Sequence, residues 1–358
     1  MAGAALLLSG TVVAAEVALP LRADDLKPGE RYRTVVHTAG IQALGKDING
    51  MRHLDDDHWS FMTAAYDAAP GAKRNVDFVI YGKPFHAMAD GVVIGCWRNA
   101  PENTPGSLHA WRTQKLIPGG GNHLWIKQDD GNTALYAHAV TGSIDAAICP
   151  NGKERYDGPS AGSGGKSPDI DPNAVVPVDK QVRVRKGQLL GRVGNSGASS
   201  GGPHLHVHLE KGGKAMPMML GRGLYAEPAD GKLALGVKWQ RLDGAAWPEK
   251  KILFWPPHSL GKSATWNGTA TADFQRMFDH FVDSGYMADT LACREKDGRV
   301  LIDSTWVPAK GAWLAYYGLS PAGYLDKKAK AVADGFHETA RYTCNTSQGA
   351  LNAVVFRK

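Results

Sequence analysis

Short apolar runs separated by glycine fill residues 73 to 212, and this pattern limits the fold more than any other feature of the chain. Examples are Gly91–Gly95, Ala134–His138 and His204–Leu209. Runs of this length suit strands better than helices, and the glycine, asparagine and aspartate between them favour turns. With 43 glycines in 358 residues, an all-helical bundle is disfavoured,. The sequence therefore predicts a mainly β fold.

The size and charge of the chain exclude some classes of protein. Its 358 residues allow roughly two or three domains of about 100 to 200 residues each, and 43% apolar content can fill their cores,. The net charge is +6, but the basic residues are scattered, with no dense stripe and no nucleic-acid reading module,. We therefore expect no nucleic-acid partner. An anionic cell envelope suits this charge equally well.

The first fifteen residues are predicted to be an export signal. Residues 1–15 carry no charge and are too short to cross a bilayer as a helix,. Val13 and Ala15 place small residues at the −3 and −1 positions of a cleavage site before Glu16,. We expect the mature protein to be periplasmic or secreted and to lack a transmembrane segment.

The chain has four cysteines and none of them forms a Cys-x-x-Cys pair, which argues against a zinc knuckle or a thioredoxin-like redox site,. Export would allow disulfides. The even count and the division of the cysteines between the two halves of the chain predict Cys96 bonded to Cys149 and Cys293 bonded to Cys344.

Composition divides the rest of the chain into four segments. Residues 16–72 are predicted to be an N-terminal extension packed on a β domain at 73–215, which carries a Gly-, Ser-, Pro- and Asp-rich insertion at 142–179. Residues 216–264 form a linker region, and 265–358 are predicted to be a two-repeat α+β module. The extension holds an acidic cluster between His53 and His58 that is typical of a solvated turn and could also bind a cation,.

The C-terminal module contains an internal repeat with a period of 50 residues. Phe274 and Tyr324 each precede a Gly-aromatic pair, at 285–286 and 335–336. Each unit is predicted to be an amphipathic helix followed by a glycine stop and two strands, with Tyr324, Ala329 and Val332 on the apolar face of the second helix,. The arrangement resembles bacterial tandem-repeat domains found beside secreted hydrolases, which implies either wall binding or support of the β domain.

The segment from Gly201 to Glu210 is the most informative one for chemistry. Side chains on a strand alternate between its faces, so His204, His206 and His208 should share one face,. Imidazole is the commonest metal ligand in proteins and a general base near pH 7. The row of histidines therefore predicts a metal site with a catalytic base beside it.

These residues resemble the lysostaphin-type, LytM-like zinc endopeptidases, which cut peptide cross-links in bacterial cell walls. The resemblance covers about 140 residues of the chain. It implies a compact antiparallel β sheet or partial barrel, one Zn²⁺ ion, and a groove for peptidoglycan or glycine-rich peptides. The shared elements are Asp77-Phe78, Ala87 to Val93, Gly121-Asn122, Asp130-Gly131, Tyr136 to His138, Val184 to Gly191, Val193 to Gly197 and Gly202 to His206.

The resemblance implies a role for four residues. Asp77 and His206 would be metal ligands, and His138 and His204 would form the catalytic pair. In the family, the first zinc-binding histidine stands four residues before the aspartate, but here that position is Lys73. Lysine is a poor ligand because its amine is protonated at neutral pH. The chain also has His208 where the family generally has glutamate.

Three explanations of the missing ligand remain open on the sequence. Another histidine could replace it, with His86 and His208 as the nearest candidates, followed by His53 or His58. The groove could instead hold metal weakly or not at all and bind wall peptides, or regulate another hydrolase of the envelope. Finally, the alignment at Asp77 could be displaced. The predicted function is a zinc-dependent, metallopeptidase-like hydrolase, and the alternative is a catalytically degenerate binding domain.

Overall fold

A computed structural model of the chain describes residues 16–27, 30–38, 40–55, 58–63, 74–160, 170–199, 201–221, 223–227, 240–242, 244–249, 252–255, 263–283, 286–347 and 349–358. The predicted export signal, Lys73 and the side chains of His53 and His58 lie outside this description. The mainly β prediction is confirmed. Among the described residues, no helix has the length and apolar character needed to cross a bilayer,.

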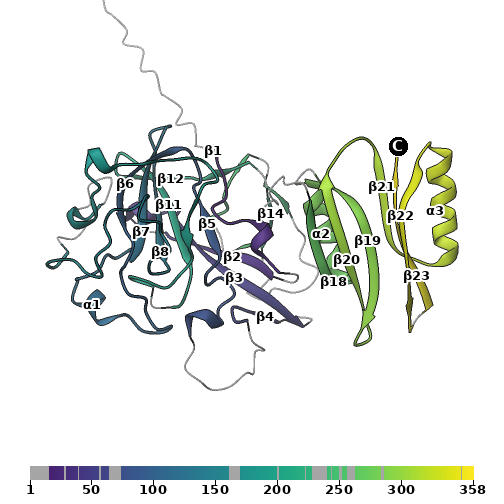
Figure 1. Ribbon diagram of the computed structural model, residues 1–358, viewed down its shortest axis with the longest axis horizontal. Helices are drawn as coiled ribbons and strands as arrows, with labels where there is room; N and C mark the ends of the chain where they lie inside the picture. Colours follow the sequence, from purple (N-terminus) through teal and green to yellow (C-terminus); the bar gives the residue numbers. More distant parts are fainter. Residues whose placement is uncertain are drawn as a thin grey trace, which may run out of the picture.

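A twelve-stranded sheet forms the larger part of the molecule, and its strands pair antiparallel (Figure 1). Along its main path the order is β15-β14-β17-β2-β3-β11-β8-β7-β6-β9, with β4 on β3 and β12 on β11. Its strands in chain order are β2 (Glu30–Val36), β3 (Lys46–Asp55), β4 (His58–Ser60), β6 (Gly91–Trp97), β7 (Asn122–Gln128), β8 (Thr133–Ala139), β9 (Arg183–Val184), β11 (Leu205–Lys211), β12 (Lys214–Met216), β14 (Leu224–Ala226), β15 (Gln240–Arg241) and β17 (Ile252–Trp255).

The centre of this sheet combines segments that are distant in sequence. β11 lies between β3 and β8, so residues 46–48 pair directly with residues 205–207. One face of β11 carries Leu205, Val207 and Leu209, which are fully buried in the core. Its other face carries His206 and His208. The predicted N-terminal extension thus contributes three strands, β2, β3 and β4, to the sheet that holds the histidine row.

Smaller elements surround the sheet. Two further sheets pair β1 (Glu16–Val17) with β13 (Met219–Leu220) and β16 (Ala245–Ala246), and β5 (Pro84–His86) with β10 (Leu189–Arg192). The helical turns are η1 (Ala23–Asp25), η2 (Gly40–Gln42), η3 (Asn75–Asp77), α1 (Ala110–Thr113), η4 (Pro172–Ala174) and η5 (Val178–Lys180). The disulfide Cys96–Cys149 ties the start of the 142–179 segment to β6, as predicted.

The C-terminal part contains two units with the same order of elements. The first is β18 (Ala264–Ala270), α2 (Thr271–Asp283), β19 (Tyr286–Lys296) and β20 (Arg299–Pro308); the second is β21 (Trp313–Leu319), α3 (Pro321–Ala333), β22 (His337–Thr346) and β23 (Gly349–Arg357). The sheet orders, β18-β20-β19 and β21-β23-β22, correspond. Each unit begins with a strand that the sequence pattern did not predict.

The two units pack through their sheets, with α2 and α3 on the outer sides (Figure 1). The predicted disulfide Cys293–Cys344 is present and joins β19 to β22. Ser320 caps α3 by accepting a hydrogen bond from the Gly323 N–H, as expected at a helix start,.

The predicted apolar face of α3 was wrong in part. Tyr324 and Ala331 are buried, whereas Ala329 and Val332 are exposed. One face of α3 packs on its own sheet, and the residues of the opposite face lie in solvent. Apolar residues occur on both faces, so helical periodicity alone does not show which face is buried.

Candidate metal centre

A β-hairpin brings His37 and Asp47 to one side of the large sheet. His37 follows β2, and Asp47 is the second residue of β3, where it pairs with Val35. The backbone N–H of His37 donates to the Gly45 carbonyl at 2.9 Å, and the Leu44 N–H donates to the His37 carbonyl at 3.0 Å. The turn between them therefore continues the hairpin pairing and fixes the direction of the His37 side chain.

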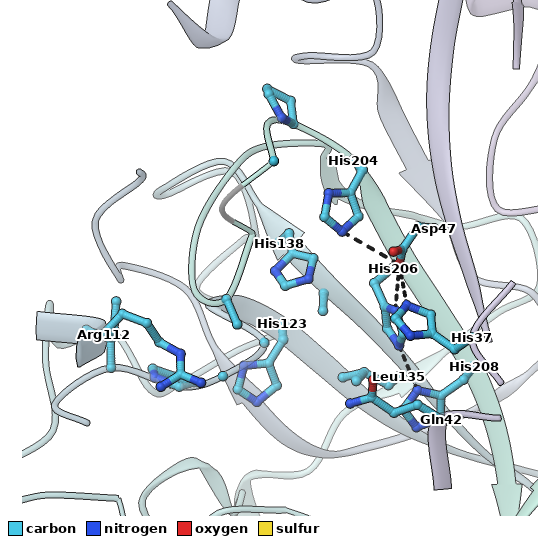
Figure 2. A pocket seen from close by; sticks show the side chains of 18 of the residues that line it. His37, Gln42, Asp47, Arg112, His123, Leu135, His138, His204, His206 and His208 are labelled. Carbon is cyan, nitrogen blue, oxygen red and sulfur yellow. Dashed lines mark hydrogen bonds and ion pairs between the residues drawn. The ribbon is translucent and has the colours of Figure 1, made fainter. Parts of the chain in front are cut away.

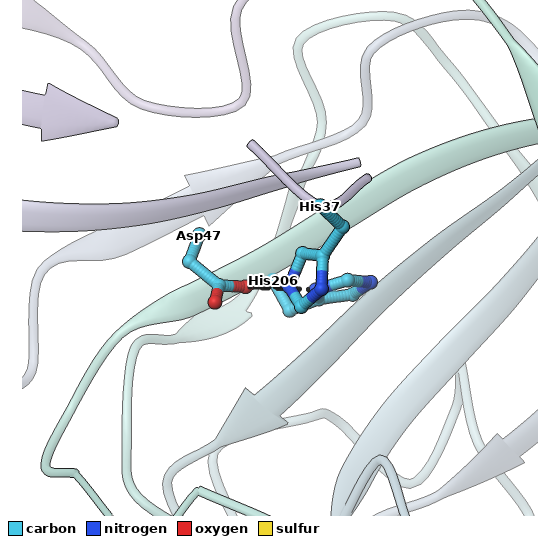
Figure 3. A group of neighbouring side chains, drawn as sticks. All are labelled: His37, Asp47 and His206. Atoms are coloured by element: carbon cyan, nitrogen blue, oxygen red, sulfur yellow. Dashed lines mark hydrogen bonds and ion pairs between the residues drawn. The ribbon is translucent and has the colours of Figure 1, made fainter. Parts of the chain in front are cut away.

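The pairing of β3 with β11 adds His206. Asp47 stands directly opposite His206, so the two side chains emerge on the same face,. His206 Nδ1 lies 2.8 Å and His37 Nε2 lies 2.9 Å from Asp47 Oδ1. The ligand atoms of the three residues all lie within 4.8 Å of one another (Figure 3). We call this set the His37/Asp47/His206 group.

The electrostatics of this group favour a bound cation. Burial by itself would raise the pKa of the Asp47 carboxyl, but hydrogen bonds from His206 and His37 outweigh burial and hold this pKa far below its usual range,. Burial lowers the pKa of His206, against the hydrogen bond with Asp47. At neutral pH the group thus contains one carboxylate, and its ion-pair partners among the described residues are imidazoles.

The donor set matches a catalytic zinc site, which uses three protein ligands of imidazole and carboxylate type and leaves a position open. Asp47 Oδ1 can only accept, so the two imidazole nitrogens that face it carry protons,. A metal ion takes the place of such protons, because histidine binds metals in its neutral form through a free lone pair. The residues present therefore fit a single Zn²⁺ ion.

His204 and His138 lie next to this group (Figure 2). His204 Nε2 is 3.6 Å from Asp47 Oδ1, and the ring centroids of His138 and His204 are 4.7 Å apart. Nδ1 of His204 lies 3.0 Å from the Gly202 carbonyl, and Nδ1 of His138 lies 2.8 Å from the Ser196 carbonyl. A carbonyl only accepts, so in each ring Nδ1 carries a proton, and the neutral form of either ring keeps its lone pair on Nε2.

A local change in β8 places His138. Its φ is +71°, in the left-handed region, and its backbone N–H donates to Gly120 rather than to a regular ladder partner,. This break in the strand alternation puts the His138 side chain on the groove side together with the β11 histidines. Burial lowers the pKa of His138 well below its usual value, so the imidazole is neutral at pH 7.

His208 lies behind His206 rather than beside the ligand atoms. Its Nδ1 is 2.9 Å from His206 Nε2, on the opposite side of the His206 ring from Asp47. Burial lowers the pKa of His208 to about 3, so its ring is neutral. If a metal replaced the proton on His206 Nδ1, the His206 proton would lie on Nε2, and His208 Nδ1 would accept a hydrogen bond from it,. In that state the contact with His208 would hold the tautomer of His206 that leaves Nδ1 to the metal.

The structure does not bring Asp77 or His86 to this group. Asp77 is in η3, where its carboxylate pairs with the exposed Arg74 guanidinium at 2.9 Å. His86 lies in β5 and its Nδ1 is 3.3 Å from the Pro20 carbonyl. The third explanation of the missing ligand, a displaced alignment, agrees best with this geometry: Asp47 takes the place expected for Asp77, and His37 supplies the imidazole.

Sequence reasoning missed His37 and Asp47 because it looked for a histidine four residues before an aspartate. Here the two residues flank a turn and meet across a hairpin. A usable signal was nevertheless present, because the two strand-like runs 30–36 and 46–51 enclose a short segment with glycines at 40 and 45,.

A groove with a volume of about 810 Å³ opens beside the group. Its lining includes His138 and His204, the glycines of 119–120 and 201–202, and apolar residues such as Ile117 and Leu135. Figure 2 shows Arg112 on the other side of the view from the His37/Asp47/His206 group, with His123 and His138 between them. An extended peptide could therefore pass across the candidate metal centre.

Comparison with known proteins gives a distant likeness. The chain matches no protein-family model. No curated protein matches it either. Among solved structures it is similar to a zinc-containing peptidase from Vibrio cholerae, with 14% sequence identity and a TM-score of 0.21. The alignment covers 49% of this chain and 48% of that one, so the chain spans about half of the peptidase. The assignment of a candidate metal centre therefore rests on the geometry of its own side chains and not on this likeness.

Proposed function

We propose that the protein is a zinc-dependent peptide hydrolase of the lysostaphin type that acts on peptidoglycan cross-links or other glycine-rich peptides. The observation that supports this most is the convergence of two imidazoles and one carboxylate, with two further imidazoles beside them, on one groove.

His37 Nε2, Asp47 Oδ1 and His206 Nδ1 would hold the ion. Zinc bound there would supply a Lewis acid for the peptide carbonyl and would lower the pKa of water to near 7. Asp47 contributes the negative charge that balances part of the metal charge. His208 holds His206 in the required tautomer,.

His204 and His138 would handle protons. His204 Nε2 faces the Asp47 carboxylate, so a proton accepted there forms an imidazolium beside a negative charge,. The same nitrogen can then return the proton to the amine that leaves. His138 remains neutral because it is buried, and its Nε2 lone pair can accept a hydrogen bond that orients the attacking water.

The rival reading, a degenerate domain that only binds peptides, depended on Lys73 standing in a ligand position. His37 weakens that hypothesis, because it offers a second imidazole from another segment. The glycine walls of the groove suit a low-bulk extended substrate,. The two disulfides are consistent with an oxidising compartment,, and we propose a periplasmic or secreted location.

The test is metal content together with hydrolysis. The full chain, dialysed at pH 7.5 with zinc and then without it, should retain one zinc ion and release new amino groups from purified peptidoglycan. A chelator should stop the release, and added zinc should restore it. A protein that retains no stoichiometric zinc contradicts the proposal, and one that retains zinc but releases no amino groups supports the peptide-binding alternative.

A further inference from the structure

We infer that Arg112, Lys115 and Tyr156 form a carboxylate-binding subsite in the groove, away from the His37/Asp47/His206 group. The inference rests on the proposed function and deepens it, because it gives the substrate peptide a negatively charged group that binds in the same groove. All three residues line the same groove as the candidate metal centre.

The two basic residues lack partners of their own. Within the described part of the chain, neither Arg112 nor Lys115 makes a side-chain hydrogen bond or an ion pair, and Arg112 Nε is fully shielded from solvent. A shielded guanidinium N–H without an acceptor is unfavourable, because it has lost its hydrogen bonds to water and gained none in the protein. Arg112 is therefore prepared for an acceptor that the described residues do not supply.

Tyr156 gives an independent indication. Its side chain is 2% exposed, and its hydroxyl has no hydrogen-bond partner among the described residues although it lines the groove. Its ring packs edge-on against Trp97 at 4.7 Å, and its backbone N–H donates to the Leu116 carbonyl, so its position is fixed. Burial and the charge of Asp171 raise the pKa of Tyr156, and the charge of Arg112 lowers it. The hydroxyl is thus protonated and can donate a hydrogen bond into the groove that Arg112 also lines.

The local charge leaves room for one carboxylate. Asp171 also lines this part of the groove, but Asn173 and the Ser160 hydroxyl bond to its two oxygens. Burial lowers the pKa of His123 to about 4, so His123 adds no charge at pH 7. The two positive charges of Arg112 and Lys115 and the one negative charge of Asp171 therefore give this part of the groove a net charge of +1.

The chemistry of these donors points to a carboxylate rather than a neutral amide. A guanidinium offers two parallel N–H groups that match the two oxygens of a carboxylate, and charge-assisted hydrogen bonds are about twice as strong as neutral ones. The carboxylate could be the C-terminus of the peptide or an acidic side chain within it. Both sources present the same group, and they can be separated by experiment.

Binding to the zinc-free full chain tests the subsite without any need for catalysis. The probes are pentaglycine with a free C-terminus, the same peptide as its C-terminal amide, and an amide-capped peptide of equal length with one internal glutamate. Titration calorimetry in the presence of a chelator should show at least tenfold tighter binding of one carboxylate peptide than of the capped pentaglycine. The tighter carboxylate peptide identifies the source of the group.

Variants assign the effect to the subsite. Arg112→Gln should remove the preference for carboxylate, and Arg112→Lys should keep part of it. Arg155→Gln is the matched control, because Arg155 is exposed, lies over the Trp111 ring and does not line the groove. Tyr156→Phe should weaken carboxylate binding several-fold while leaving the urea midpoint equal or higher, since it removes a buried hydroxyl that has no partner.

Three results would overturn the subsite: equal binding of acid and amide peptides, no measurable binding of either acid at millimolar concentration, or a Tyr156→Phe variant that is destabilised but binds normally. Failure of the hydrolase proposal is recognised separately. Carboxylate preference that depends on Arg112 in a protein without zinc-dependent cleavage supports the subsite and contradicts the hydrolase.

Discussion

Replacing Asp47 by Asn should abolish stoichiometric zinc binding, whereas the same replacement at Asp77 should leave it unchanged. Structural zinc sites with four ligands bind with about 10–16 kcal/mol, or about 3 kcal/mol for each ligand. Because 1.4 kcal/mol changes an affinity tenfold, loss of Asp47 should weaken zinc binding at least about 100-fold. The structural reason is that Asp47 Oδ1 contacts both His37 and His206 at 2.8–2.9 Å.

Competition with a chromophoric chelator at pH 7.5 measures this affinity for the wild type and both variants. Asn preserves the shape of the side chain, and circular dichroism should report the same fold for all three proteins. Asp77→Asn is the matched control, because the Asp77 carboxylate is in an exposed ion pair with Arg74 outside the groove. Normal zinc affinity in Asp47→Asn together with its loss in Asp77→Asn would refute the ligand assignment.

Three further predictions concern the surroundings of the centre. His208→Leu should lower zinc affinity about 10- to 100-fold, because it removes the hydrogen bond that orients the His206 ring,. His208→Gln should lower the affinity less. Equal zinc affinity in the wild type and both variants would contradict this role of His208. His123, whose folded pKa is about 4, stays neutral while the unfolded chain takes up a proton below about pH 6.5. The free energy of unfolding therefore falls as pH falls, and in His123→Asn this fall between pH 7.5 and 4.5 should be smaller by about 2.5 kcal/mol. Urea unfolding in the presence of a chelator measures it at each pH. The prediction is wrong if the free energy of unfolding depends on pH equally in both proteins. Gly121→Ala should destabilise the fold by more than about 2 kcal/mol, because the added Cβ would lie 2.3 Å from a backbone atom of Ser196 at a φ of +61°. Gly131→Ala should destabilise it less, because the added Cβ would meet only the Lys211 side chain, at 3.4 Å. Equal urea midpoints for the two variants would contradict the predicted clash at Gly121.

Local sequence determined the parts of this protein that depend on short-range periodicity or on counting. Alternation along 204–210 placed the histidines of β11 together, since a strand has a period of two residues,. The short glycine-separated runs gave the mainly β class. The count and division of the cysteines gave both disulfides, Cys96–Cys149 and Cys293–Cys344.

Tertiary structure decided which residues complete the candidate metal centre. Asp47 and His206 are 159 positions apart and meet only because β3 pairs with β11 in one register. A shift of one residue would turn Asp47 to the opposite face of the sheet. No local pattern encodes that register, because it is set by the burial of Ile48, Leu205 and Val207 in a core that many distant segments share. The histidine row of β11 can be predicted from the sequence, but Asp47 and His37 join it only through strand pairing.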